Sequence, residues 1–308
     1  MMLDREQIET ALAGLDLGMV TAVTELSGGH AAVFKVDLAD GRPVILKVYR
    51  ADHTKPDKDA FAAALLRDRA LPIAHYLLVD DSRAKLPFGF AITSYLPGVA
   101  AGSLKNHLDI ASLYRQTGAL LRSLHEVKMP AYGAFGAEGI VDPLASNEAS
   151  ICKRIAHSFE WFVAMGGEPA LGERLRDIAE ARFDSIVPFS KGAVFAHDDL
   201  HPNNVLGVED ESGKLVLSGL IDFGNARAAD PVVDLAKCLF CSEHDAPGST
   251  PHILAGYGEI EHPDPAGALW YYTLLHRVTM WCWLRRVGVI ATADTPSGLI
   301  DDLRMMTA

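Results

Sequence analysis

The sequence has few cysteines and no long apolar run, and each of these absences excludes a class of protein. Four scattered cysteines in 308 residues are too few for the disulfide framework of small secreted domains. No uncharged stretch reaches the roughly 18 residues of a membrane-spanning helix, and the apolar segment Ala268 to Ala291 is interrupted by arginines. The segment Met1 to Ala13 is acidic and polar, where a secretory signal is basic and then apolar. These absences predict a cytoplasmic protein without a membrane partner.

Positive charge is also scarce. The chain has 28 Lys and Arg against 40 Asp and Glu, a net charge of −12. Non-specific binding to nucleic acid depends on neutralising phosphates with Lys and Arg, so the balance argues against a nucleic-acid partner. It is compatible with a small cationic partner. The hydrophobic content of 49% is typical of a globular protein with a buried core.

The pattern of apolar residues divides the chain into two parts, 1–96 and 97–308. The first part is expected to contain helices over 4–15 and 57–69 and strands over 21–25, 32–38, 43–49, 76–80 and 88–95. The sequence Leu-Pro-Gly at 96–98 then breaks the pattern. The second part is expected to contain helices over 110–127, 146–165, 169–186, 230–242 and 266–287, with a short β-rich block over 193–221.

The chemistry is concentrated in two motifs of this β-rich block. The first is HDDLHPNN, which starts at His197, and the second is IDFG, which starts at Ile221. An Asp followed five residues later by an Asn, on a loop between short strands, suits phosphoryl transfer. Asp199 can receive or orient an acceptor hydroxyl, while the amide oxygen of Asn204 serves a Mg²⁺ site. Asp222 offers the same hard cation a second oxygen ligand.

The two motifs resemble the catalytic loop and the metal-binding motif of the aminoglycoside phosphotransferase and choline kinase-like family. The resemblance covers about residues 20–240, and its motifs are specific in combination. It implies an α+β, two-lobed protein kinase-like fold, with a small antiparallel β-sheet lobe and a larger, mainly helical lobe. It also implies that ATP or GTP and Mg²⁺ bind in the cleft between the lobes.

The resemblance assigns roles beyond the two motifs. Lys47 resembles the strand lysine that contacts the nucleotide phosphates. The turn Ser27-Gly28-Gly29 resembles the segment that covers those phosphates. The residues of the expected hinge would hold the adenine through backbone groups: Ser94, Tyr95 and Leu96. Asp199 would be the catalytic base, and three residues would support its loop: His197 packed against Phe223, and Asp234 from the following helix.

The sequence departs from the family pattern at two positions. Family members usually pair the strand lysine with a Glu of the small-lobe helix, but no Glu occurs between residues 50 and 75. Asp59 is the nearest substitute, with Asp57 behind it. Asp198 stands where the family more often has Gly. This extra carboxylate either attracts a cationic acceptor or caps a turn.

The resemblance and the acidic charge together favour an aminoglycoside or a similar amino-alcohol as the acceptor. The alternatives are a metabolic kinase for choline, homoserine, a thio-sugar or a sugar amine, and a nucleotide-binding pseudoenzyme that acts as a regulator. The cleft motifs are shared by all of these kinases and do not choose among them. Four acids of the second part are candidates for amine recognition, although a solvated surface is their commoner role: Glu243, Asp245, Glu259 and Glu261.

Overall fold

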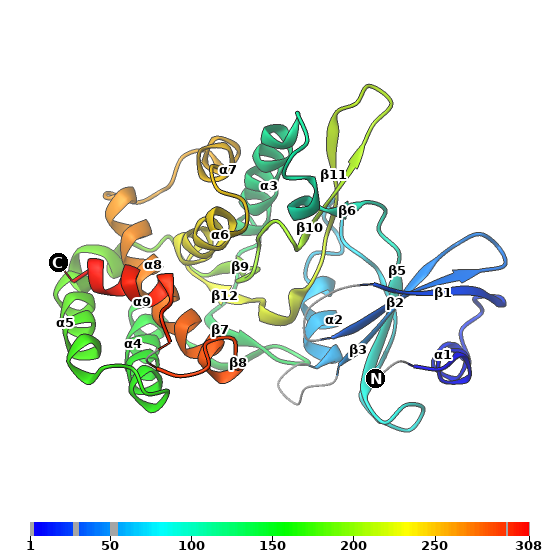
Figure 1. Ribbon diagram of the computed structural model, residues 1–308, viewed down its shortest axis with the longest axis horizontal. Helices are drawn as coiled ribbons and strands as arrows, with labels where there is room; N and C mark the ends of the chain where they lie inside the picture. The colour runs from blue at the N-terminus through cyan, green and yellow to red at the C-terminus, as the bar shows by residue number, and fades with distance from the viewer. Residues whose placement is uncertain (1–2, 27–30, 50–54, 294, 308) are drawn as a thin grey trace.

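The first part of the chain forms an antiparallel sheet with the strand order β1-β2-β3-β5-β4. The computed structural model describes residues 3–26, 31–49, 55–293 and 295–307 (Figure 1). The strands are β1 (Val20–Leu26), β2 (Ala32–Leu38), β3 (Val44–Tyr49), β4 (Tyr76–Asp80) and β5 (Gly89–Ser94). Burial alternates along β2 and β3, because successive side chains of a strand point to opposite faces. Helix α1 (Arg5–Leu12) adds Ile8 to the core on one of these faces.

Helix α2 (Pro56–Ala64) connects the sheet to the rest of the molecule. It begins with a proline in its first turn, where the missing N–H costs nothing. The Phe61 ring packs edge-on against Phe135 at 5.5 Å between centroids, and Ala62 lies in the same core as Phe223. The helix ends earlier than predicted, because tight turns such as Leu66 N–H to Ala63 O follow it.

A glycine makes the crossing between the two parts possible. Gly98 has a φ of +113°, and a Cβ at this position would lie 2.6 Å from the Gly207 carbonyl oxygen. Only glycine tolerates both conditions. The chain then enters β6 (Val99–Ala100), which pairs with β10 (Val205–Glu209), and β10 pairs with β11 (Leu215–Leu220). This small sheet positions the loop before β10 and the segment after β11, which carry the two sequence motifs.

Helices and a third sheet, of order β8-β7-β12-β9, complete the larger lobe. Its strands are β7 (Tyr132–Phe135), β8 (Ile140–Leu144), β9 (Val194–Ala196) and β12 (Arg227–Ala229). Its helices are α3 (Ile110–His125), α4 (Asn147–Ala164), α5 (Pro169–Ile186), α6 (Pro231–Asp245), α7 (Thr250–Tyr257), α8 (Pro265–Arg286) and α9 (Gly298–Met305). Helix α8 buries Tyr271, Tyr272 and Trp281 in a core shared with α4, α5 and α6.

The two-lobed α+β fold predicted from the sequence is confirmed (Figure 1). The structure adds β6, β7, β8, β12, α7 and α9, which the sequence did not predict. Several of these strands have only two to four residues, and alternation cannot be recognised over so short a length. The proposed division after residue 96 would fall between β5 and β6. None of the helices in the described ranges is long and apolar enough to cross a bilayer.

Candidate active site

The loop of residues 197–204, between β9 and β10, is held in place by Asp234 of α6. Asp234 is fully buried. Its Oδ2 accepts the backbone N–H of His197 and its Oδ1 accepts that of Asp198, both at 2.8 Å. Its Oδ2 also lies 3.1 Å from Nε2 of His125. A buried carboxylate needs such donors, and here two of them belong to the loop, so Asp234 fixes the loop backbone.

His197 connects this loop to the second motif. Its ring packs against Phe223 with 5.2 Å between ring centroids, which is the contact expected from the sequence. Its Nε2–H donates to the carbonyl oxygen of Ile221 at 3.1 Å. Burial of the ring lowers the pKa of His197 below its ordinary value, so the imidazole is neutral near pH 7. The side chain therefore acts as a fixed spacer between the two motifs.

Asp199 is oriented by three neighbours. Its Oδ2 accepts Nδ2–H of Asn225 at 3.0 Å, and its Oδ1 lies 3.5 Å from Nζ of Lys237. Its backbone carbonyl accepts Nδ2–H of Asn204 at 2.9 Å. The side chain remains 25% exposed, so a ligand can reach the carboxylate. The sequence analysis missed Asn225 and Lys237. The spacing of Lys237 from Asp234, three residues along α6, could have indicated it, because this spacing puts both on one helix face.

Lys47 of β3 lies between two carboxylates. Its Nζ is 2.9 Å from Oδ2 of Asp59 and 2.8 Å from Oδ1 of Asp222. Asp59 is buried and also accepts the Tyr49 hydroxyl at 2.7 Å. Burial alone lowers the pKa of Lys47, but the two carboxylates outweigh it and raise this pKa above its ordinary value. The amine is therefore a fixed positive charge, and its partner on the small-lobe helix is Asp59, the substitute expected from the sequence.

Asn204 and Asp222 fit a magnesium site. The N–H of Ile221 donates to the carbonyl oxygen of Asn204 at 3.0 Å, which brings the two motifs together. Asn204 donates its amide N–H to the backbone carbonyl of Asp199, and its Oδ1 makes no hydrogen bond within the described ranges. Asp222 has a φ of +66° and a side chain about half exposed, at 48%. Lys47 holds the pKa of Asp222 below its ordinary value despite partial burial, which by itself raises it.

These two residues cannot form a complete metal site on their own. In the part of the chain that the structure describes, no group of three or more His, Cys, Asp or Glu side chains could hold a metal. Mg²⁺, however, is commonly bound by one or two carboxylates together with substrate phosphates. Asn204 and Asp222 therefore match a cation that arrives with a nucleotide.

The expected hinge presents free backbone groups at two of its three positions. Ser94 is engaged within the small lobe, since its N–H donates to the carbonyl of His75 and its Oγ accepts the N–H of His75, each at 2.9 Å. Tyr95 and Leu96 make no backbone hydrogen bond to any other described residue. They are the hinge positions available to a nucleotide base. The expected phosphate-covering turn, Ser27-Gly28-Gly29, lies outside the described residues.

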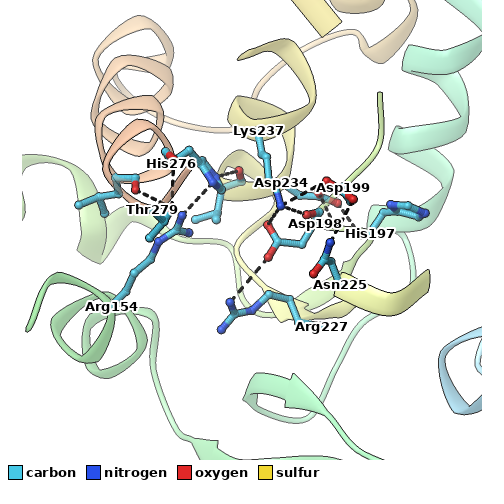
Figure 2. A network of polar contacts seen from close by, with 12 residues as sticks. Arg154, His197, Asp198, Asp199, Asn225, Arg227, Asp234, Lys237, His276 and Thr279 are labelled. Atoms are coloured by element: carbon cyan, nitrogen blue, oxygen red, sulfur yellow. Dashed lines mark hydrogen bonds and ion pairs between the residues drawn. The ribbon is translucent and has the colours of Figure 1, made fainter. Parts of the chain in front are cut away.

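Asp198 does not face the solvent as a free acidic group. It adopts a φ of +52°, and its side chain is 14% exposed. Its carboxylate lies 3.7 Å from Arg227 and 3.8 Å from Lys237 (Figure 2). Burial by itself raises the pKa of Asp198. Lys237 and Arg227 outweigh this effect, so the pKa lies well below its ordinary value. The extra carboxylate therefore neutralises cations of the protein itself.

Comparisons with known proteins identify the family and the fold. Residues 22–271 match the model of the Phosphotransferase enzyme family. A thermostable mutant of aminoglycoside phosphotransferase APH(4)-Ia, in ternary complex with ADP and hygromycin B, has a TM-score of 0.74 at 19% identity over 98% of both chains. The GDP and kanamycin complex of APH(2")-IIia has a TM-score of 0.65 at 16% identity over 97% of both chains.

A third solved structure, a macrolide 2'-phosphotransferase type I, has a TM-score of 0.62 at 17% identity over 98% of this chain and 96% of that chain. A comparison with curated proteins gives no match. At identities this low, the solved structures establish a shared fold.

Proposed function

We propose, from the premise that this chain belongs to the phosphotransferase enzyme family, that it transfers the γ-phosphoryl group of ATP or GTP to a hydroxyl of a small molecule. Asp199 would be the catalytic base. The observation that carries this proposal is the meeting of two loops. One loop presents Asp199 and Asn204, and the other presents Asp222, which Lys47 contacts from the sheet at 2.8 Å.

Asp199 would act on the acceptor hydroxyl. The hydroxyl would donate a hydrogen bond to the carboxylate, and its proton would pass to Asp199 as the new O–P bond forms and the bond to the leaving diphosphate breaks. The transition state of phosphoryl transfer is loose, so positioning and electrostatics matter most. The contacts of Asp199 with Asn225 and Lys237 support such a role because they orient the carboxylate before the substrate arrives.

The nucleotide would lie between the lobes. Lys47 would contact the α- and β-phosphates while it keeps Asp59 as its ion-pair partner. Asn204 and Asp222 would hold Mg²⁺, which when bound offsets the negative charge of the phosphates. The turn Ser27-Gly28-Gly29 would cover these phosphates. The backbone groups of Tyr95 and Leu96 would bind the base. The reaction would take place in the cytoplasm, which supplies ATP, GTP and Mg²⁺.

Two classes of acceptor are supported by different observations. An aminoglycoside, or a similar cationic amino-alcohol, is supported by the neighbours that were crystallised with hygromycin B and kanamycin, and by the net charge of −12. A small metabolic alcohol such as choline, homoserine, a thio-sugar or a sugar amine shares the same cleft chemistry. Within this second class, the cations beside Asp199 favour an acceptor that also carries an acidic group.

The proposal is tested by measuring ADP and GDP release from the purified protein, with and without Mg²⁺, across a panel of acceptors. The panel contains aminoglycosides, choline, homoserine, a thio-sugar and sugar amines. Release that one acceptor stimulates, and that Mg²⁺ removal abolishes, is the expected result. Nucleotide binding without stimulated release by any acceptor would favour the regulator instead.

A further inference from the structure

Four cationic side chains from four separate elements lie around Asp198, the neighbour of Asp199 in the chain. Arg227 comes from β12, Lys237 from α6 and Arg154 from α4 (Figure 2). The fourth, Lys58 of α2, lies within electrostatic range of Arg227 and Lys237. Such a gathering of like charges is unfavourable unless carboxylates or a bound anion compensate it. We therefore compare the positive charge of the cluster with the carboxylates that lie near it.

The carboxylates available inside the protein do not balance these cations. Lys237 lies near both acids, since its Nζ donates to the backbone carbonyl of Asp198 and is 3.5 Å from Oδ1 of Asp199. Arg154 makes no ion pair with the residues that the structure describes, and its Nη2 instead contacts Nδ1 of His276 at 2.8 Å. Lys58 is offset mainly by Asp59, which also pairs with Lys47. The remaining three cations, Arg154, Arg227 and Lys237, are set against two acids, Asp198 and Asp199, which leaves an excess of positive charge.

The titration of two members of the cluster agrees with this excess. Burial lowers the pKa of Arg154 to about 10; Asp198 opposes this shift and Arg227 adds to it. Burial also lowers the pKa of Lys58; Asp59 and Asp198 oppose this shift, and Arg227 and Lys237 add to it. His276 does not add to the charge, because burial and then Arg154 depress its pKa well below the ordinary value. Additional negative charge at this place would be stabilised.

Arg227 is the member best placed to receive that charge. Its closest carboxylate oxygen, Oδ2 of Asp198, is 3.7 Å away, which is too far for a hydrogen bond. Its buried Nε has no hydrogen-bond partner in the described part of the chain. The side chain is nevertheless 32% exposed. A guanidinium with unused donors in a fork geometry is suited to bidentate binding of a carboxylate or a phosphate.

We propose that Arg227, assisted by Lys237, binds an anionic group of the acceptor, a carboxylate or a phosphate, and so places the acceptor hydroxyl against Asp199. This inference rests on the proposed phosphotransferase function and specifies its acceptor. Within the classes considered above, it selects acceptors such as a hydroxy amino acid over an aminoglycoside, which has no anionic group.

The position of the cluster favours the acceptor over the nucleotide as the source of the anion. The phosphate-contacting lysine, Lys47, is paired separately with Asp59 and Asp222. Three of the four cations in the cluster belong instead to β12, α4 and α6 of the larger lobe, and none comes from the five-stranded sheet. The cluster therefore belongs mainly to the larger lobe and not to the sheet that carries Lys47.

Two of the four acids that could recognise an amine are occupied elsewhere. Glu243 accepts the N–H of Gly248 and the N–H and hydroxyl of Thr250. Asp245 accepts from His201 at 2.7 Å and from Asn203 at 3.0 Å. Arg122 contacts Glu259 only at its backbone carbonyl and lies 3.9 Å from the largely exposed carboxylate of Glu261. Of the four candidate acids, the two on α6 are thus already engaged by other groups of the protein.

Calorimetry with inorganic phosphate tests the binding site independently of turnover. The protein is first loaded with Mg²⁺ and a non-hydrolysable ATP analogue, so that the nucleotide site is filled, and inorganic phosphate is then titrated in. We expect saturable binding that weakens about tenfold or more in Arg227→Gln and is retained in Arg174→Gln, a control on the exposed face of α5. Phosphate binding only without the analogue would assign the cluster to the nucleotide and overturn the inference, as would an unaffected Arg227→Gln.

Kinetics with matched acceptors tests the substrate class. Homoserine is compared with homoserinamide, which lacks the carboxylate, and a sugar phosphate with its parent sugar. We expect the member with the anionic group to be preferred in at least one pair, and Arg227→Gln to raise the KM of that member about tenfold or more while the nucleotide KM stays within about twofold. Turnover of aminoglycosides alone would overturn the anionic acceptor and leave the phosphotransferase function intact. Absence of all turnover would count against that function, whereas the calorimetry would still decide on the anion site.

Discussion

Replacing Asp59 tests whether an aspartate has taken over the role of the family's glutamate. Asp59→Asn keeps the shape of the side chain and removes its charge. The carboxylate oxygen that is lost receives Nζ of Lys47 at 2.9 Å and the Tyr49 hydroxyl at 2.7 Å, and it is buried. Lys47 would still contact Asp222, so the variant should retain a folded site with a lysine that is less firmly held.

The size of the effect follows from the loss of one charged hydrogen bond. Such a bond contributes about 1.5–3 kcal/mol, which corresponds to a factor of about 10–150 in affinity or rate. We therefore expect Asp59→Asn to reduce kcat/KM for the nucleotide by about this factor. The KM for the acceptor should change far less, because no acceptor group contacts Lys47 in the proposed arrangement.

Steady-state kinetics with varied nucleotide and saturating acceptor measures this effect. Asp57→Asn is the matched control, since Asp57 lies on the same helical turn and makes no ion pair with any described residue. Circular dichroism of both variants separates a local effect from unfolding. If Asp59→Asn kept a nucleotide kcat/KM within about twofold of the parent, as the control should, the role of Asp59 in holding Lys47 would be refuted.

Three other carboxylates of the site give separate expectations. Asp222→Asn should raise the Mg²⁺ concentration for half-maximal activity by about tenfold or more, and an unchanged requirement would contradict its assignment. Asp234→Ala leaves two loop N–H groups and Nε2 of His125 without their partner, so urea unfolding should show a loss of about 2–4 kcal/mol. A loss under about 1 kcal/mol would count against the anchoring role. Lys237 helps to hold the pKa of Asp198 below its ordinary value. The stabilisation of the folded protein by ionised Asp198 is therefore present above about pH 4 and lost at lower pH. The unfolding free energy should fall more steeply in this range for the parent than for Asp198→Asn, and equal slopes would contradict the pairing.

The sequence was most informative where the chemistry is local. Asp199, Asn204 and Asp222 lie within one short segment of the sequence. Each lies on a loop that follows a short strand, as the sequence predicts. The absence of Glu from the small-lobe helix pointed to Asp59, and the structure shows Asp59 paired with Lys47. Such inferences succeed because neighbouring positions in the sequence remain neighbours in a strand, a helix or a loop.

The sequence was least informative where distant elements meet. Arg154 is far in the chain from Arg227 and Lys237, and only the packing of α4 against β12 and α6 brings the three to Asp198. Each residue alone has the pattern of a solvated surface cation. Net charge was also a poor guide, since a chain with a net charge of −12 places cations beside Asp199.

The most direct test of the phosphotransferase function is to detect the phosphorylated acceptor itself. Phosphorus NMR follows the parent and Asp199→Asn with Mg²⁺, the nucleotide and the best acceptor of the panel. The function predicts a new phosphate-ester resonance that forms with the nucleoside diphosphate in equal amounts, and about 10²–10⁴-fold slower in Asp199→Asn, the usual range for a positioned base. Formation of free inorganic phosphate without an ester, or an equal rate in Asp199→Asn, would contradict it.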